Sequence, residues 1–334
     1  MQVVTFGAHV LDVVVHPVDS IPDGQGAALV PHIRLVPAGP AGGTAITLAK
    51  LGAVVSTVGA VGRDDSADLL TTMLQRRGVV TEHLLRVDGQ PTSMSVLPIR
   101  SNGDRPALHM PGANLAYPLD RVPLDLLTSA DHVHIGAPEL LNPSELAGVL
   151  ERIRAAGVRV SADILAPGDP GVLSWIEPVL PHLDYLLPND EQVLGFTGAT
   201  DLVDGCRALI DRGVACVAAT AGADGAWVVT GDGAEHAAAT DVEVVDTSGC
   251  GDAFSAGFIA GRLHDFSLLR SAQLGCAVAG VVATGLGSDH GDFDWESATA
   301  GLPAEVAAGL PARGHPGRSV RRLSRLRRWG SDHR

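Results

Sequence analysis

The chain has 334 residues, of which 46% are hydrophobic, and its formal net charge at pH 7 is −14. The charge is uneven, because residues 313–334 contain eight arginines and one acid, which gives them a formal +7 and leaves −21 on the rest. Such an acidic body argues against a nucleic-acid substrate, and no apolar run is long enough to cross a bilayer.

The length suits one large domain over residues 1–300, followed by a basic, flexible tail over residues 301–334. Apolar residues at every third position of the tail also allow a short basic amphipathic helix. The first seven residues look like a strand rather than a secretory signal. The cysteines show no paired metal-binding spacing, which indicates reduced thiols and a cytoplasmic protein: Cys206, Cys216, Cys250 and Cys276.

Strand-like and helix-like segments alternate along the chain, which predicts a mostly parallel sheet covered by helices. The predicted strands are residues 3–6, 54–58, 132–135, 158–162, 185–187, 216–220 and 226–229. The predicted helices are residues 44–51, 66–77, 143–156, 190–196, 202–212, 253–263 and 268–283. Two stretches, residues 13–38 and 90–112, interrupt the alternation, and the second contains a strand-like run over residues 94–99.

The segment from residue 242 to residue 254 is the most informative part of the chain. A strand-like run, residues 242–245, precedes Asp-Thr-Ser-Gly-Cys-Gly-Asp, residues 246–252, and a helix-like run follows. Glycines at such a corner let backbone N–H groups converge, and the start of the helix attracts phosphate oxygens. A carboxylate at Asp252 is unfavourable beside phosphate unless it accepts a proton, which indicates a general base acting on a hydroxyl. The segment therefore predicts a phosphotransferase.

Two other interpretations of this segment stay open. An ordinary turn between a strand and a helix would show the same pattern, with Asp252 as an acid in the first helical turn. A dinucleotide-binding fingerprint fits less well, because Phe254 stands where close packing of helix on strand requires a small residue.

The pattern Asp-Thr-x-Gly-x-Gly-Asp-x-Phe-x-x-Gly, which begins at Asp246, resembles the second signature of the ribokinase-like carbohydrate kinases, the PfkB family. The resemblance implies an α/β fold, a Rossmann-like three-layer αβα sandwich with a small β-sheet lid from residues 13–38 and 90–112. It also implies transfer of the γ-phosphoryl group of ATP to a hydroxyl. Asp252 would be the base, and the anion hole would consist of Gly249, Cys250 and Gly251.

Two blocks near the N-terminus resemble the same family. Gly39, Gly42, Gly43 and Thr44 lie in its first, glycine-rich signature, which implies substrate binding, although Gly43 replaces an Asn that touches a sugar hydroxyl. Asp12 matches an early Asp that binds sugar hydroxyls, and a carboxylate can accept two such hydrogen bonds. On the residues alone, Asp12 could equally form a turn, and the glycines could serve only helix packing.

Further blocks imply the nucleotide and metal sites. Gln192 stands where the family's Asn-x-x-Glu motif has a Glu that organises Mg²⁺ through water, so the implied magnesium residue is Gln192 or its neighbour Glu191. Asp246 and residues 277–288 fall where relatives bind a monovalent cation such as K⁺. The residues implied to bind ATP are Asn189, Thr220, Gly222, Gly225, Gly249 and Gly251.

The resemblance leaves the acceptor open. The predicted lid contains no aromatic residue, which disfavours stacking of a purine. We therefore expect a small sugar or sugar acid rather than a nucleoside such as adenosine. A non-catalytic sugar- or nucleotide-binding regulator is the remaining alternative, because Gly43 and Gln192 depart from the family pattern.

Relatives often pair through their lids, which implies a homodimer. A sugar phosphate would need extra cations, for which the candidates are Lys50, Arg63, Arg100 and Arg105.

Overall fold

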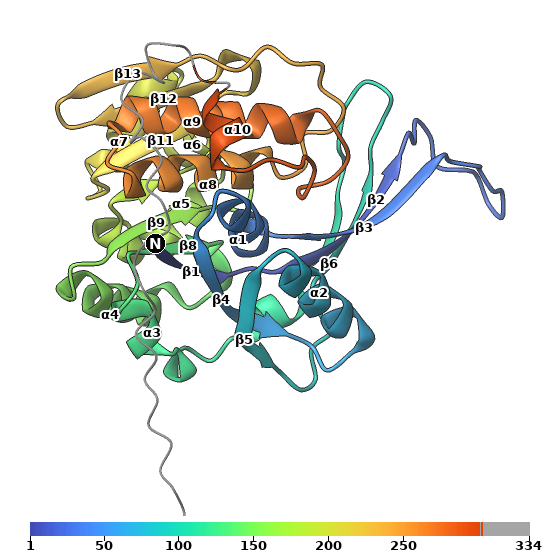
Figure 1. The fold of residues 1–334 in the computed structure, drawn as a ribbon, viewed down its shortest axis with the longest axis horizontal. Helices are drawn as coiled ribbons and strands as arrows, with labels where there is room; N and C mark the ends of the chain where they lie inside the picture. Colours follow the sequence, from blue (N-terminus) through green and yellow to red (C-terminus); the bar gives the residue numbers. More distant parts are fainter. Residues whose placement is uncertain (301, 303–334) are drawn as a thin grey trace, which may run out of the picture. The chain divides into compact units, whose positions relative to one another are not determined.

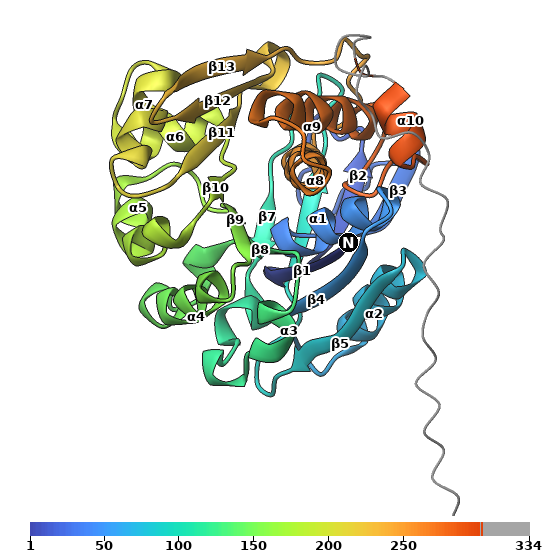
Figure 2. The same cartoon turned by 60° about the vertical axis from the view of Figure 1, so that its left-hand side comes forward.

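A nine-stranded sheet forms the centre of the structure (Figures 1 and 2), a computed structural model that describes residues 1–300 and 302. The strands in their order across the sheet are β13 (Gly233–Ala237), β12 (Ala226–Thr230), β11 (Cys216–Thr220), β10 (Tyr185–Leu186), β9 (Arg159–Asp163), β8 (His132–Gly136), β1 (Gln2–Gly7), β4 (Val54–Val61) and β5 (Val79–Arg86). Neighbours from β11 to β5 pair in parallel, whereas β12 and β13 are antiparallel.

Helices cover both faces of this sheet, which gives three layers. One face carries α1 (Pro40–Lys50), α8 (Cys250–Leu263) and α9 (Leu268–Ala283). The other carries α3 (Leu124–Thr128), α4 (Pro143–Ala155), α5 (Pro170–Ile176), α6 (Asp190–Thr197) and α7 (Leu202–Ile210). Alternate residues of β11 supply the two cores: Val217 packs with α7, and Ala218 packs with α8. Strands buried on both faces are typical of parallel sheets between helices.

The strand order reverses between β1 and β8, because the chain proceeds from β1 to β4 in one direction and from β8 to β11 in the other. Such a reversal leaves a crevice at the carboxyl ends of the strands, where α/β proteins bind ligands. Two more helices complete the fold: α2 (Asp65–Arg76) packs on β5, and α10 (Trp295–Ala300) packs on α9. Among the described residues, no helix combines the length and apolar character needed to span a membrane.

A second, four-stranded sheet comes from the two stretches in which the sequence predicts a lid, and we call it the lid sheet. Its order is β3 (His32–Ala38), β2 (Val10–His16), β6 (Met94–Pro98) and β7 (Leu108–Met110). Residues that pair across strands share a face, so the pairing register defines two rows. One row is Val36, Asp12, Ser95 and His109, and the other is Leu35, Val13, Val96 and Leu108.

The seven strands and seven helices predicted for the main domain are confirmed, as is the lid strand at residues 94–98. The predicted strand over residues 242–245 is wrong. Val245 N donates to Ala283 O at the end of α9 (2.8 Å), and Val242 and Val244 line a pocket between α8 and α9, so the segment does not pair with the edge strand β13. Strands β5 and β13 were missed because polar residues interrupt their apolar pattern. The predicted tail, apart from Leu302, lies outside the described residues.

Candidate active site

The first turn of α8 forms the corner at which the sequence predicts phosphate binding. Gly249 is the N-cap residue, and its φ of 76° is left-handed. A Cβ at this position would lie 2.2 Å from Ser288 Cβ, so both the conformation and the available space require glycine. The first N–H groups of an α-helix have no partner within the helix and carry its positive dipole end. Residues 249–251 therefore form a site suited to an anion, which we call the anion corner; of its N–H groups, that of Cys250 also donates to Thr247 O (3.2 Å).

Asp252 is the third residue of α8, and its half-buried side chain lies against the start of α1. A Cβ on Gly43 would lie 2.1 Å from Asp252 Oδ2, which means that the carboxylate occupies the space a side chain at position 43 would fill. Thr44 Oγ1 also donates to Asp252 O (3.4 Å). The N-termini of two helices thus meet at this carboxylate. The other glycines of the first signature lie beside it, with Gly39 as the N-cap and Gly42 in the first turn of α1.

The lid sheet contributes a second carboxylate to the same site. Burial and the nearby carboxylate of Asp12 raise the pKa of Asp252 to about 7, an effect that Arg105 opposes. Burial likewise raises the pKa of Asp12 to about 6, against the hydrogen bond from Ser95 and the charge of Arg105. Ser95 Oγ also lies 3.0 Å from His109 Nδ1. One face of the lid sheet therefore carries a connected polar row, which consists of Asp12, Ser95 and His109.

A pocket of about 420 Å³ adjoins the corner. It lies between α8, α9 and the turn that joins β11 to β12, and it brings together four of the predicted ATP-binding residues: Thr220, Gly222, Gly225 and Gly251. Asn189 lies next to this group through a β-bridge to Thr220. The irregular segment 239–244 forms one wall of the pocket, to which it contributes the apolar side chains of Val242 and Val244. This wall explains why the run is apolar although it forms no strand.

The family model for pfkB family carbohydrate kinases matches residues 2–294, almost the whole described part of the chain. The chain belongs to the PfkB family. It is an ATP-dependent carbohydrate kinase with the ribokinase-like fold that the sequence predicts. An ATP-dependent ribose-1-phosphate kinase of Halopiger xanaduensis is 31% identical over 267 residues, which are 80% of this chain and 86% of that protein.

Two solved structures share the fold of this PfkB kinase. Arabidopsis thaliana ribokinase complexed with ribose and ATP has a TM-score of 0.79 and 22% identity, and the match covers 90% of this chain and 98% of that one. A ribokinase II structure from E. coli, described as putative and in complex with ATP and Mg²⁺, has a TM-score of 0.77 and 20% identity, with coverage of 90% and 98%.

Gln192 of the kinase is the centre of a hydrogen-bond network. Its Oε1 accepts from Asn189 N (2.9 Å), while Asn189 Oδ1 accepts from Gln192 N (2.8 Å), so the pair caps α6. Its Nε2 donates to Ile164 O and Ala166 O, each at 2.9 Å. The amide therefore clamps the loop after β9, and Glu191 beside it is exposed. A role of either residue in holding magnesium through water stays a prediction.

Asp246 is fully buried and joins two loops of the kinase. Its Oδ1 accepts from Ser248 N (2.8 Å) and Ser248 Oγ (2.6 Å), and its Oδ2 accepts from Gly287 N (2.8 Å). The carboxylate thus holds the anion corner against residues 285–288. Its predicted part in a monovalent-cation site is not tested by this geometry.

Sequence reasoning missed Asp163, the last residue of β9. Its Oδ1 accepts from Ile164 N (2.7 Å) and its Oδ2 from Ser255 Oγ (3.3 Å). Burial and the nearby Asp252 carboxylate raise the pKa of Asp163 well above its usual value. The available signal was an acid directly after a buried strand of a parallel sheet, because such strand ends meet at the ligand-binding edge.

Proposed function

We propose that Asp252 accepts the proton of an acceptor hydroxyl while the γ-phosphoryl group of ATP is transferred to that hydroxyl. The observation that carries the proposal is the half-buried carboxylate, whose pKa is raised to about 7, at the start of α8 beside the predicted nucleotide pocket. A base with a pKa near the working pH is both sufficiently ionised and sufficiently basic for this task.

The N–H groups of Gly249, Cys250 and Gly251 would stabilise the negative charge on the phosphoryl group in the transition state. They precede Asp252 in the same helical turn, so base and anion hole are held by one rigid element. Burial raises the pKa of the Cys250 thiol to about 12, which keeps this residue neutral beside the phosphate. The pocket between α8 and α9 would hold the rest of the nucleotide.

The residues around Asp252 fit a magnesium ion that accompanies ATP. Asp163 and Asp252 present carboxylate oxygens, the ligand type that Mg²⁺ prefers, and the negative charge of Asp252 raises the pKa of Asp163. Within the described residues there is no group of three or more His, Cys, Asp or Glu side chains that could hold a metal alone. When bound, Mg²⁺ would neutralise charge on the nucleotide phosphates. Asp163, rather than Gln192, would therefore help to hold the ion.

The acceptor that fits best is a small sugar with an acidic substituent. Asp12 would bind its hydroxyls, and Arg105 is the cation whose charge reaches both Asp12 and Asp252. Two other candidate cations are engaged elsewhere: Lys50 donates to three backbone carbonyls of residues 289–291, and Arg63 pairs with Asp88. The absence of aromatic residues from the lid sheet continues to disfavour a nucleoside.

The test is ADP release with ATP and magnesium across a panel of neutral sugars, sugar acids, sugar phosphates and nucleosides. Asp252→Asn is expected to bind ATP but to lose most turnover, and Asp232→Asn, an exposed turn residue, serves as the matched control. Acceptor-dependent turnover that survives in Asp252→Asn would remove this residue from the role of base. Bound ATP without turnover on any acceptor would favour the non-catalytic regulator.

We also propose a homodimer formed through the lid sheet. The row opposite Asp12 is apolar and exposed: Leu35 is 44% exposed, Val96 40% and Leu108 71%. Apolar side chains gathered on one sheet face are typical of an interaction surface, and a second copy would bury them.

Two further proposals concern ions and location. Asp246 and the backbone of residues 285–288, which it holds, would bind a monovalent cation such as K⁺ next to the anion corner. A cytoplasmic location is supported by the four cysteines, all of which are unpaired in the part of the chain that the structure describes.

A further inference from the structure

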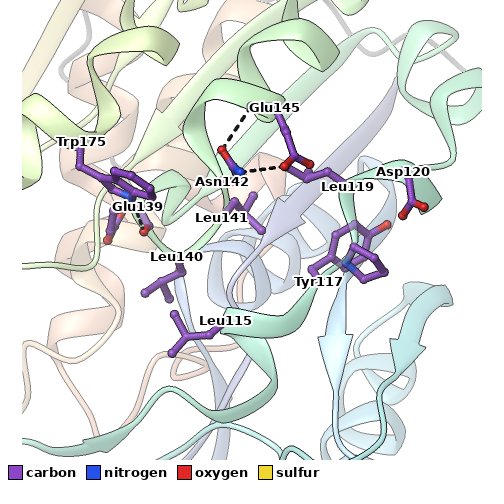
Figure 3. A pocket seen from close by; sticks show the side chains of 11 residues that line it. Leu115, Tyr117, Leu119, Asp120, Glu139, Leu140, Leu141, Asn142, Glu145 and Trp175 are labelled. Atoms are coloured by element: carbon purple, nitrogen blue, oxygen red, sulfur yellow. Dashed lines mark hydrogen bonds between the residues drawn. The ribbon is translucent and has the colours of Figure 1, made fainter.

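A second pocket lies beside the short 3₁₀-helix η3 (Pro138–Leu140), and we call it the η3 pocket. Its volume is about 540 Å³. Figure 3 shows its two ends, with Trp175 and Glu139 at one and Tyr117 and Asp120 at the other. Leucine side chains lie between these ends, so the pocket has an apolar middle and polar ends.

The η3 pocket is separate from the active site. It shares no lining residue with the nucleotide pocket, the anion corner or the first glycine-rich signature. Tyr117 and Leu141 of the η3 pocket belong to the core beneath α3–α7, whereas Phe254 of the nucleotide pocket belongs to the core beneath α8 and α9. The two pockets therefore lie on opposite faces of the central sheet.

Two buried polar atoms of this pocket lack a hydrogen-bond partner among the described residues. They are Tyr117 Oη and Glu139 Oε2. Tyr117 is only 8% exposed, and its ring is held by an edge-to-face contact with Phe6 at 5.0 Å between centroids. An unsatisfied buried polar atom destabilises a fold by about 1–3 kcal/mol, so such atoms usually have a water or a ligand as partner.

The Glu139 carboxylate is fixed in position on its other side. Oε1 accepts from Leu165 N (2.7 Å) and Ala166 N (2.8 Å), the same loop that Gln192 clamps. Trp175 Nε1 donates to Glu139 O (3.1 Å), which sets the indole ring beside the carboxyl group. The carboxyl group and the adjacent aromatic ring are thus held side by side, and because Oε2 is buried, a ligand reaches it once a neighbouring side chain of the pocket moves.

The charge of the lining selects the kind of ligand. Three acids line the pocket, Asp120, Glu139 and Glu145, and no Lys, Arg or His does. Glu145 Oε1 is already engaged by Asn142 Nδ2 (2.7 Å), which leaves Oε2 of Glu139 as the buried carboxylate oxygen without a donor. Cations are attracted both to a carboxylate and to the face of an indole ring.

We propose that the η3 pocket binds a primary ammonium group carried on a small aromatic or aliphatic body. The ammonium would donate to Glu139 Oε2 beside the Trp175 ring, the body would lie over Leu140 and Leu141, and Tyr117 Oη would meet a polar group at the far end. The site shares no lining residue with the nucleotide pocket, although the Glu139 carboxyl group is close enough to raise the pKa of Asp163. It does not depend on the function proposed above.

The test is isothermal titration calorimetry of the full chain with phenethylammonium at pH 7, compared with 2-phenylethanol, which has the same shape and no charge. Phenethylammonium is expected to bind about tenfold or more tightly than the alcohol, because a charge-assisted hydrogen bond contributes more than a neutral one. Glu139→Gln should weaken the ammonium about tenfold, since Gln can still accept from Leu165 N and Ala166 N but carries no charge.

Glu151→Gln, on the exposed side of α4, is the matched control and should leave the affinity unchanged. If Glu139→Gln fails to fold, Trp175→Leu replaces it, because Trp175 is 53% exposed and its loss is tolerable to the core. Trp175→Leu should also weaken the ammonium. The inference is overturned if the alcohol binds as well as the ammonium, if neither variant weakens binding, or if saturating ATP displaces the probe.

Discussion

Gly43 determines where the carboxylate of Asp252, the proposed base, lies, and Gly43→Ala tests this directly. The added Cβ would lie 2.1 Å from Asp252 Oδ2, 2.8 Å from its Cγ and 3.0 Å from its Cβ. Carbon and oxygen atoms normally stay more than about 3 Å apart, so the carboxylate must move by about 1 Å. The change leaves the chemistry of every proposed site residue intact and alters only the position of the base.

A misplacement of about 1 Å can lower a rate about 100-fold, or about 2.7 kcal/mol of transition-state stabilisation. We therefore expect kcat/KM to fall about 100-fold for Gly43→Ala. The fold should be retained, because position 43 lies inside α1 with ordinary helical geometry and alanine is the better helix former by about 0.5–1 kcal/mol.

Gly148→Ala, a glycine-to-alanine change inside α4 and away from the site, is the matched control. Its Cβ would meet no atom within 4 Å. ADP release measured at several ATP and acceptor concentrations, together with thermal unfolding, separates a displaced base from a damaged fold. Near wild-type kcat/KM in a folded Gly43→Ala protein, or equal losses in the two variants, would refute the reasoning.

Four other predictions concern ionisation, the Gln192 clamp and the lid sheet. The kcat/KM of the wild type should rise with pH through about 7, because Asp252 must lose its proton to act as a base; a profile flat from pH 5 to 9 would contradict this. The raised pKa means that ionisation of Asp252 opposes folding between about pH 4 and pH 7, so stability present at low pH is lost as the pH rises. Asp252→Asn should therefore raise the unfolding free energy at pH 8 by about 2 kcal/mol, roughly half of what the full pKa shift would give without solvent screening, and so raise the urea midpoint. An unchanged midpoint would contradict the burial argument. Gln192→Glu should lower the unfolding free energy by about 2 kcal/mol, because a carboxylate cannot donate to Ile164 O and Ala166 O; equal urea midpoints would show that the clamp is unimportant. Leu108→Lys should shift a lid-mediated dimer to monomer in sedimentation velocity, whereas the exposed substitution Leu69→Lys on α2 should not, and a dimer that persists would place the interface elsewhere.

Local patterns were sufficient for the layers and for the chemical signatures. The alternation of strands and helices predicted the parallel sheet, because strands covered on both faces are apolar and their connections are helical. The corner at residues 249–252 was also readable, since glycines before a helix and an acid inside its first turn are a short-range pattern. The segment 242–245 shows where such patterns fail, because its apolar residues line a pocket beside α8 and α9 instead of pairing with the edge strand β13.

By itself, the sequence determined the family, the order of the main elements and the glycine-rich start of α8, all of which depend on neighbours along the chain. Only the tertiary structure decided that Gly43 makes room for Asp252, that Gln192 clamps a loop, and that Asp163 and Asp12 lie near the same carboxylate. It alone revealed the unpartnered atoms of the η3 pocket, Tyr117 Oη and Glu139 Oε2. Contacts between residues far apart in sequence leave no local pattern, because their distances are set by the packing of whole helices and strands.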